Sequence, residues 1–481
     1  MYDTKLISLI STLNVERRRK LRKWIKSNFV NKNDDIIKFF EYIDSRKSLS
    51  PRSITKDKAH DFVYPQTQYN DLRIRHLLWM TTEIVEDFVA YSNIHQQPIL
   101  YKQLLAQNYI EHEYYKLAEQ IIEENIADLE HAKQRNVSYH LQHFQAQALY
   151  FRLKSRNDRS SAFNLQKVMD QLAIFSIIES LKYACISQSI QKISANMLNN
   201  HLLDATFKLL ENPFFLNNTA VRIYYNTYKV LTNEDEDAYK ELIIDLKESS
   251  NSFSLQDVRE LYLSAINFCI KKSNQNIAEY TSQAFDLYIY AIQHKYLMEH
   301  NEISRFSFTN VVTLGLKLKE LDRTEKFILQ FSKSIHIEYR KMTVGFNMAK
   351  VQYAKGDLQK ALKHLLTNEF NDILWNLNAK YLILKILFEL NDMKMFAIHL
   401  KAFKMFVQRK ANIGYHRDYF VNVGKALIIL RDIQKQPEQF KDFSFSKDTA
   451  DIEWFNKELA KIKKSARKPT KRKSSKKIKK N

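Results

Sequence analysis

The sequence predicts an all-α protein, a solenoid of antiparallel helix pairs that ends in a disordered basic tail. Its 481 residues include only 5 Gly and 6 Pro, about 1% each, where ordinary usage is roughly 7% and 5%. This scarcity excludes turn-rich β architectures and any glycine-rich phosphate loop. Up to about residue 460, apolar residues recur at steps of three and four, and sustained period-two alternation is scarce. Hydrophobic residues make up 45% and aromatic residues 12% of the chain, so general disorder is also excluded.

Residues 1–95 form the first segment, an N-terminal helical cap region. Asn14 is suited to cap a helix whose buried stripe contains Leu21, Trp24 and Ile25. The stretch LRKWIKSNFVNKN is similar to the opening of some bacterial helical-repeat proteins of unknown function. A terminal unit of a solenoid must hide one apolar face, so we expect this segment to close the array.

Residues 96–460 form the second segment, a run of helices separated by short polar breaks. The breaks include TNEDED at 232–237, KKSNQN at 271–276 and KGD at 355–357. Short connections between amphipathic helices produce antiparallel hairpins. We therefore expect roughly a dozen helix pairs with a period of about 34 residues.

The clearest repeat unit lies at 342–375. Ala349 on its first helix and Ala361 on its second are small enough to let two backbones approach, and Gly356 permits a left-handed turn. This pattern resembles the 34-residue tetratricopeptide repeat. The resemblance implies a right-handed α-solenoid.

Other units match this pattern by spacing more than by residue identity. The matching positions are Gly315 in the preceding unit, Asn391-Asp392 at the next turn, Ala106 and Ala118 in 99–132, and Ala205 in 202–209. The first-helix Trp of the family is absent, its closing Pro is missing from most units, and large Phe residues occupy usually small positions. We expect Ala106, Ala118, Gly315, Ala349, Gly356 and Ala361 to make the close helix contacts.

Residues 461–481 form the third segment, a disordered Lys/Arg-rich tail. They contain twelve Lys or Arg and no acid, which leaves +9 of the total +21 on residues 1–460. A flexible polycation binds nucleic acid by releasing counterions, and the alternatives are an inert solubilising tail or attraction to anionic lipid. The polyanion-binding residues expected in the tail are Lys463, Lys464, Arg467, Lys468, Lys471, Arg472, Lys473, Lys476, Lys477, Lys479 and Lys480.

Signatures of catalysis are missing from the sequence. It contains no GxxxxGK[ST], GxGxxG, GxSxG or HExxH motif, so we expect no catalytic residue, cofactor or metal. His140 and His143 share a helix face, yet we interpret them as solvated polar residues rather than metal ligands. The acidic run 234–237 is interpreted as a helix start, and Cys185 and Cys269 as buried apolar residues.

The function we expect is a non-enzymatic scaffold or adaptor that binds a peptide or protein segment, with the tail tethered to a polyanion. The alternative is a helical-repeat protein that binds RNA or DNA, or associates with the ribosome, along a basic concave face. An enzyme built from scattered residues is a third hypothesis. The basic cluster at 17–26 is interpreted as a solvated face. No stretch reaches the roughly 18 apolar residues of a membrane span, so we expect a cytoplasmic protein.

Overall fold

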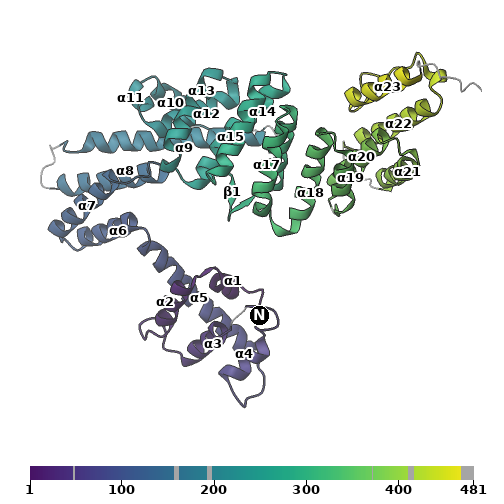
Figure 1. Ribbon diagram of the computed structural model, residues 1–481. Coiled ribbons are helices and arrows are strands. Elements are labelled where there is room, and N and C mark those ends of the chain that lie inside the picture. Colours follow the sequence, from purple (N-terminus) through teal and green to yellow (C-terminus); the bar gives the residue numbers. More distant parts are fainter. Residues whose placement is uncertain (47–48, 157–161, 192–197, 371, 410–415, 467–481) are drawn as a thin grey trace, which may run out of the picture. The chain divides into compact units, whose positions relative to one another are not determined.

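The computed structural model describes residues 1–46, 49–156, 162–191, 198–370, 372–409 and 416–466, which form 23 α-helices and one two-stranded sheet (Figure 1). The predicted all-α class is therefore confirmed. The chain divides into two compact units, the first comprising 1–228 with 247–254 and the second 229–246 with 255–481. Each unit is described by itself.

The helices up to residue 254 are joined mostly by short connections. They are α1 (Lys5–Thr12), α2 (Val15–Ile25), α3 (Asp34–Asp44), α4 (Lys56–Val63), α5 (Asp71–His95), α6 (Pro98–Glu111), α7 (Tyr115–Glu130), α8 (Val137–Lys154), α9 (Leu165–Gln191), α10 (Leu203–Leu210), α11 (Pro213–Leu216), α12 (Thr219–Asn233), α13 (Glu236–Ser249) and the 3₁₀ turn η1 (Ser250–Ser252).

The helices beyond residue 254 are interrupted by a single β-hairpin. They are α14 (Leu255–Asn274), α15 (Ala278–Gln293), β1 (Met298–Glu299), β2 (Glu302–Ile303), α16 (Arg305–Lys317), α17 (Leu321–Phe331), η2 (Ser332–Ser334), α18 (Ile337–Ala354), α19 (Leu358–Leu366), α20 (Ile373–Glu389), α21 (Met393–Arg409), α22 (His416–Lys435), η3 (Pro437–Phe440) and α23 (Ile452–Ala466).

In the first unit, helices α1 to α5 enclose a core of their own, which extends from Leu6 to Phe88. The starts of α2, α3, α4 and α5 are fixed by side-chain caps. Asn14, Asn33, Thr55 and Asn70 each accept a hydrogen bond from a backbone N–H in the first turn. Such caps satisfy donors that a helix start otherwise leaves open. That this region closes the repeat array stays a prediction.

Consecutive helices pack as pairs, most closely α6 with α7, α8 with α9, α14 with α15, and α18 with α19. In the second unit a single apolar core runs from α18 to α23. The antiparallel course of successive helices can be followed in Figure 1.

The turns inside five pairs of consecutive helices share one geometry. The pairs are α6–α7, α14–α15, α16–α17, α18–α19 and α20–α21. Gly356 has φ +84°, and Glu113, Asn276, Lys319 and Asn391 hold the same turn position with φ between +59° and +67°. In each case the next residue donates its N–H to a carbonyl five residues earlier, as Asp357 does to Gln352 at 2.9 Å. This is the Schellman end of a helix.

Five of the six small residues predicted at helix contacts are buried, whereas Gly356 is exposed in its turn, with no atom within 4 Å of an added Cβ. Ala106, Ala118, Ala349 and Ala361 are each at most 1% exposed. A Cβ on Gly315 would come within 2.0 Å of the Thr324 Oγ1 on α17, so α16 and α17 meet at this glycine.

In α10 the residue predicted to make the helix contact, Ala205, was wrong by one position. Ala205 is exposed, whereas Thr206 is buried and donates to the Ser180 Oγ of α9 at 2.9 Å. The buried Thr206 hydroxyl is tolerated in this helix contact because it has a hydrogen-bond partner. A sequence pattern that accepts only Ala or Gly at the contact position does not recognise Thr206.

The expected tail begins later than the sequence indicates. Residues 461–466 belong to α23, whose apolar stripe Trp454, Phe455 and Leu459 continues to Ile462, which is 7% exposed. One apolar residue at helical spacing therefore extends the helix into the basic segment. Residues 467–481 lie outside the described residues.

Candidate functional site

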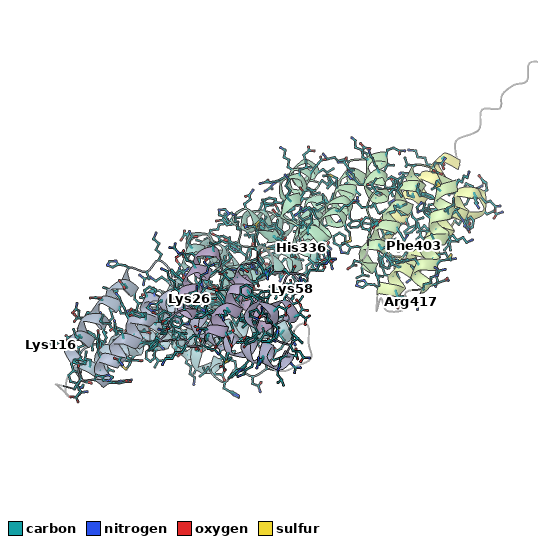
Figure 2. The ribbon with its side chains drawn as sticks, turned by 90° about the horizontal axis from the view of Figure 1, so that it is seen from below. Lys26, Lys58, Lys116, His336, Phe403 and Arg417 are labelled. Carbon is teal, nitrogen blue, oxygen red and sulfur yellow. The ribbon has the colours of Figure 1, made fainter. Side chains whose placement is uncertain are left out.

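A pocket of about 470 Å³ lies in the second unit. We call it the hairpin pocket, because β1 and β2 form one wall. Its lining comprises Arg259, Leu263, Leu297, Glu299, His300, Glu302, Ile303, Ser304, Arg305, Phe306, Ser307, Ile335, His336 and Tyr339. His336 lies at the start of α18 (Figure 2) and accepts a hydrogen bond from the Glu338 N–H.

The hairpin wall results from a tight two-residue turn. Met298 pairs with Ile303 and Glu299 with Glu302, and the turn residues His300 and Asn301 have φ +49° and +64°. Two successive positive φ values match the twist of antiparallel strands, and Asn tolerates this conformation well. The hairpin therefore contributes Glu299, His300 and Glu302 to the lining of the pocket.

Arg259 of α14 secures this wall. Two glutamates directly opposite each other on a hairpin repel, and the Arg259 guanidinium forms an ion pair with Glu299. The same guanidinium donates to the Met298 carbonyl at 2.7 Å. One side chain thus offsets the like-charge pair and anchors the strand to the helix.

Arg305 is the cation best placed to meet a ligand. Its guanidinium lies 4.9 Å from the ring centroid of Phe306 and 4.8 Å from that of Tyr339. The Phe306 side chain is 62% exposed and Tyr339 is 37% exposed. Within the described part of the chain, Arg305 pairs with Asp372 at 3.3 Å, and the Arg305 side chain is 23% exposed. A guanidinium has five N–H donors, and Asp372 accepts from one of the Arg305 nitrogens.

The chemistry of the hairpin pocket suits binding. Ring faces, apolar side chains and a partly satisfied guanidinium recognise a ligand that combines an apolar group with an anion. Among the residues that the structure describes, no group of three or more His, Cys, Asp or Glu could hold a metal ion.

A second, polar pocket of about 460 Å³ lies in the first unit around His140 of α8. The His140 Nδ1 is 3.1 Å from the Gln171 Oε1, and its Nε2 is 3.4 Å from the Asn218 Nδ2. Amide oxygens accept and amide nitrogens donate, so these bonds select the neutral tautomer with the proton on Nδ1. Burial lowers the pKa of His140 to about 4.

This arrangement is structural in character. The Asn218 carbonyl oxygen accepts from the N–H groups of Ala220 and Val221 at the start of α12, while its amide nitrogen reaches His140. His140 therefore ties α8 to α9 and to α12. No carboxylate, thiol or lysine is among the described lining residues, and both imidazole nitrogens face amide groups.

The interpretation of His140 as a solvated residue was wrong, because its side chain is only 4% exposed. Burial also lowers the pKa of His143. The burial of His140 could not be predicted from the sequence, because its partners Gln171 and Asn218 lie 31 and 78 residues away.

The other sequence candidates take structural places. Asp235 accepts from the N–H groups of Asp237 and Ala238, so the acidic run begins α13 as predicted. Cys185 and Cys269 are both buried, as predicted, and neither forms a disulfide within the described residues.

Two of the expected polyanion-binding residues, Lys463 and Lys464, lie on α23, and Lys463 donates to the Phe443 carbonyl at 2.8 Å. The remaining nine lie outside the described residues. They are Arg467, Lys468, Lys471, Arg472, Lys473, Lys476, Lys477, Lys479 and Lys480.

Comparisons with protein-family models, with curated proteins and with solved structures found no match to this chain. No described helix is both long enough and apolar enough to cross a membrane. The hairpin pocket was missed from the sequence. Its signal is a short polar run, Glu299 to Glu302, between the apolar Met298 and Ile303, which is difficult to distinguish from a loop among so many helices.

Proposed function

We propose that this protein is a non-enzymatic, cytoplasmic scaffold, a right-handed tetratricopeptide-like solenoid that binds a peptide segment in its hairpin pocket. The observation that carries the proposal is the position of Arg305 between the exposed rings of Phe306 and Tyr339. Exposed aromatic residues beside an arginine are the residue types that dominate binding energy at protein interfaces.

The ligand that fits best is an extended segment with an apolar side chain next to a carboxylate. The apolar side chain would cover the exposed Phe306 ring and the half-buried Leu263, which removes apolar surface from water. The carboxylate would accept from the Arg305 guanidinium. The overall charge of +21 favours acidic partners further.

The test is selection of phage-displayed random peptides on the full-length chain, followed by affinity measurement on variants. Selected peptides should share an apolar residue beside Asp or Glu. Phe306→Ala should weaken their binding by about tenfold or more, because truncating an interface anchor costs about 2 kcal/mol. Arg305→Gln should remove the preference for an acid.

A matched control is Leu329→Ala, since Leu329 is 64% exposed on α17 and does not line the pocket. This variant should bind as the wild type does. The proposal fails if Leu329→Ala weakens binding as much as Phe306→Ala, or if no peptide family depends on either Phe306 or Arg305.

We also propose that the basic residues from 467 onward tether the protein to a polyanion, with nucleic acid favoured. The support is the charge of the segment 461–481, twelve cations without an acid. Replacing the basic residues of 467–481 with Gln should lower nonspecific RNA binding and reduce its salt dependence. An unchanged salt dependence in filter binding would contradict the tether.

A further inference from the structure

A third pocket, of about 540 Å³, lies in the first unit between α2 and the end of α5. We call it the ring pocket. Its floor is aromatic and includes Trp24, Phe88 and Tyr91, and its rim includes Arg17, Lys20 and Lys23. The sequence places these cations in a cluster, and the fold adds the aromatic surface beside them. Lys26, at the end of α2, marks this helix in Figure 2.

The rings form a continuous series along α5 and into α6. Ring centroids are 4.9 Å apart for Trp24 and Tyr91, 4.3 Å for Tyr91 and His95, and 4.8 Å for His95 and Tyr101. Tyr91 is 49% exposed, and His95 and Tyr101 are also exposed. Three exposed rings, Tyr91 and His95 of α5 and Tyr101 of α6, therefore offer more surface than one bound side chain would cover.

The pocket holds polar donors without acceptors. The Trp24 Nε1 and the Arg17 Nε are buried and have no hydrogen-bond partner among the described residues. Another Arg17 nitrogen donates to the Asn93 Oδ1 at 3.2 Å. Buried donors that lack acceptors are costly, and a ligand oxygen reaches these two only when the side chains around them shift.

The charge at the rim is positive on balance. Glu16 pairs with Lys20 at 2.8 Å, while Lys23 has no ion pair within the described part of the chain. Lys26 is neutralised by Glu41. The C-terminal end of α5 contributes roughly half a negative charge. Three cations against one acid and this partial charge leave the rim able to hold an anion.

We propose that the ring pocket binds single-stranded nucleic acid, with bases stacked on Tyr91 and His95 and phosphates held by Arg17, Lys20 and Lys23. Stacking platforms combined with a basic groove are how proteins bind single strands without reading sequence. The successive accessible rings favour a chain of planar bases over an acidic peptide, which would use the cations and leave most of the rings uncovered. This inference concerns the first unit and is independent of the hairpin pocket.

The test uses the full-length chain and a fluorescein-labelled oligouridylate of about eight nucleotides that contains one 4-thiouridine. Ultraviolet crosslinking and peptide mapping should place crosslinks on α2 and on the C-terminal half of α5. Tyr91→Ala should weaken binding roughly tenfold in fluorescence anisotropy. Lys23→Gln should reduce the slope of log affinity against log salt by about 0.7, as the loss of one phosphate contact predicts.

Two matched controls distinguish binding at the ring pocket from the effect of losing any exposed tyrosine or any exposed lysine. Tyr114→Ala removes another exposed tyrosine, 59% accessible in the turn before α7. Lys116→Gln removes another exposed lysine, labelled in Figure 2. The first should bind as the wild type does, and the second should leave the pocket crosslinks in place. Lys23 is exposed, so its variant tests the site even if Tyr91→Ala proves unstable.

Several results would overturn the inference. One is crosslinking confined to residues 467–481, with Tyr91→Ala and Lys23→Gln both binding as the wild type does. Another is a glutamate-rich peptide that binds in a Tyr91-dependent way while the oligonucleotide leaves α2 and α5 uncrosslinked, since that result would assign the pocket to an acidic protein segment.

Discussion

Lys319 and Glu113 adopt a backbone conformation that glycine adopts at least cost. Their φ values are +62° and +64°, in the same turn position where Gly356 has +84°. A side chain in this region costs roughly 1 kcal/mol, because its Cβ approaches a carbonyl oxygen. The two positions therefore contain removable strain.

We expect Lys319→Gly to raise the free energy of unfolding by about 0.5–1 kcal/mol, less than the strain because glycine gains entropy in the unfolded chain. Gly356→Ala should lower it by about 1 kcal/mol, although no atom lies within 4 Å of the added Cβ. Urea denaturation of the two variants measures both effects. A destabilised Lys319→Gly would contradict the strain argument.

His140 makes the stability of the first unit depend on pH. Its pKa is lowered by burial to about 4 in the folded chain, against about 6.5 when unfolded. Protons therefore bind the unfolded chain preferentially. The contribution of the neutral ring is complete above pH 6.5 and is lost as the pH falls toward 4, about 3 kcal/mol in all.

We expect His140→Asn to reduce this pH dependence of unfolding between pH 6.5 and 4. The matched control is His112→Asn, because the His112 ring is exposed at the end of α6. Unfolding free energies from denaturant titrations at several pH values provide the measurement. Equal pH dependence in the wild type and in His140→Asn would show that other groups cause it.

At the scale of elements, a network of hydrogen bonds connects α23 and the residue before it to α18 and α20. The Trp454 Nε1 donates to the Glu389 Oε1 at 2.7 Å, and Tyr353 donates to the same oxygen. Asp451 accepts from Tyr381 at 2.7 Å and from Lys385 at 2.8 Å. Beneath this network Phe455, Leu459 and Ile462 are buried.

We expect Trp454→Phe to destabilise the second unit by about 1–2 kcal/mol, because Glu389 loses a donor while the ring remains. Phe455→Ala should cost about 3–5 kcal/mol through the cavity it leaves. Thermal or urea unfolding distinguishes the two. Equal losses in both variants would mean that packing alone holds α23.

Helix pairing could be predicted at this scale, whereas the pockets could not. The helical period involves residues only three and four positions apart, so the helices α18 and α19 can be predicted from local sequence. The bond from Lys385 to Asp451 spans 66 residues, and the ring pocket joins α2 to α5. Such pairings arise from tertiary packing, which no local pattern encodes.

At the scale of the whole molecule, helices pack mainly against their neighbours along the chain. In such arrays stability is approximately the sum of unit terms and nearest-neighbour contacts. A change at one end should therefore act locally. This behaviour differs from that of a domain with a single central core.

We expect Phe455→Ala to reduce hydrogen-exchange protection in α20 to α23 and to leave α1 to α5 as in the wild type. Amide exchange followed by mass spectrometry resolves the two regions. A loss of protection that spreads over the N-terminal helices would show that the chain unfolds as a single cooperative unit.

The left-handed turns also explain why the repeats are difficult to recognise. At four of the five paired-helix turns described, Glu, Asn or Lys occupies the place that Gly356 holds. The turn positions 276, 319, 356 and 391 are 43, 37 and 35 residues apart. These turns share one backbone conformation but differ in residue type and in spacing, so a search for identical residues at a fixed period would miss them.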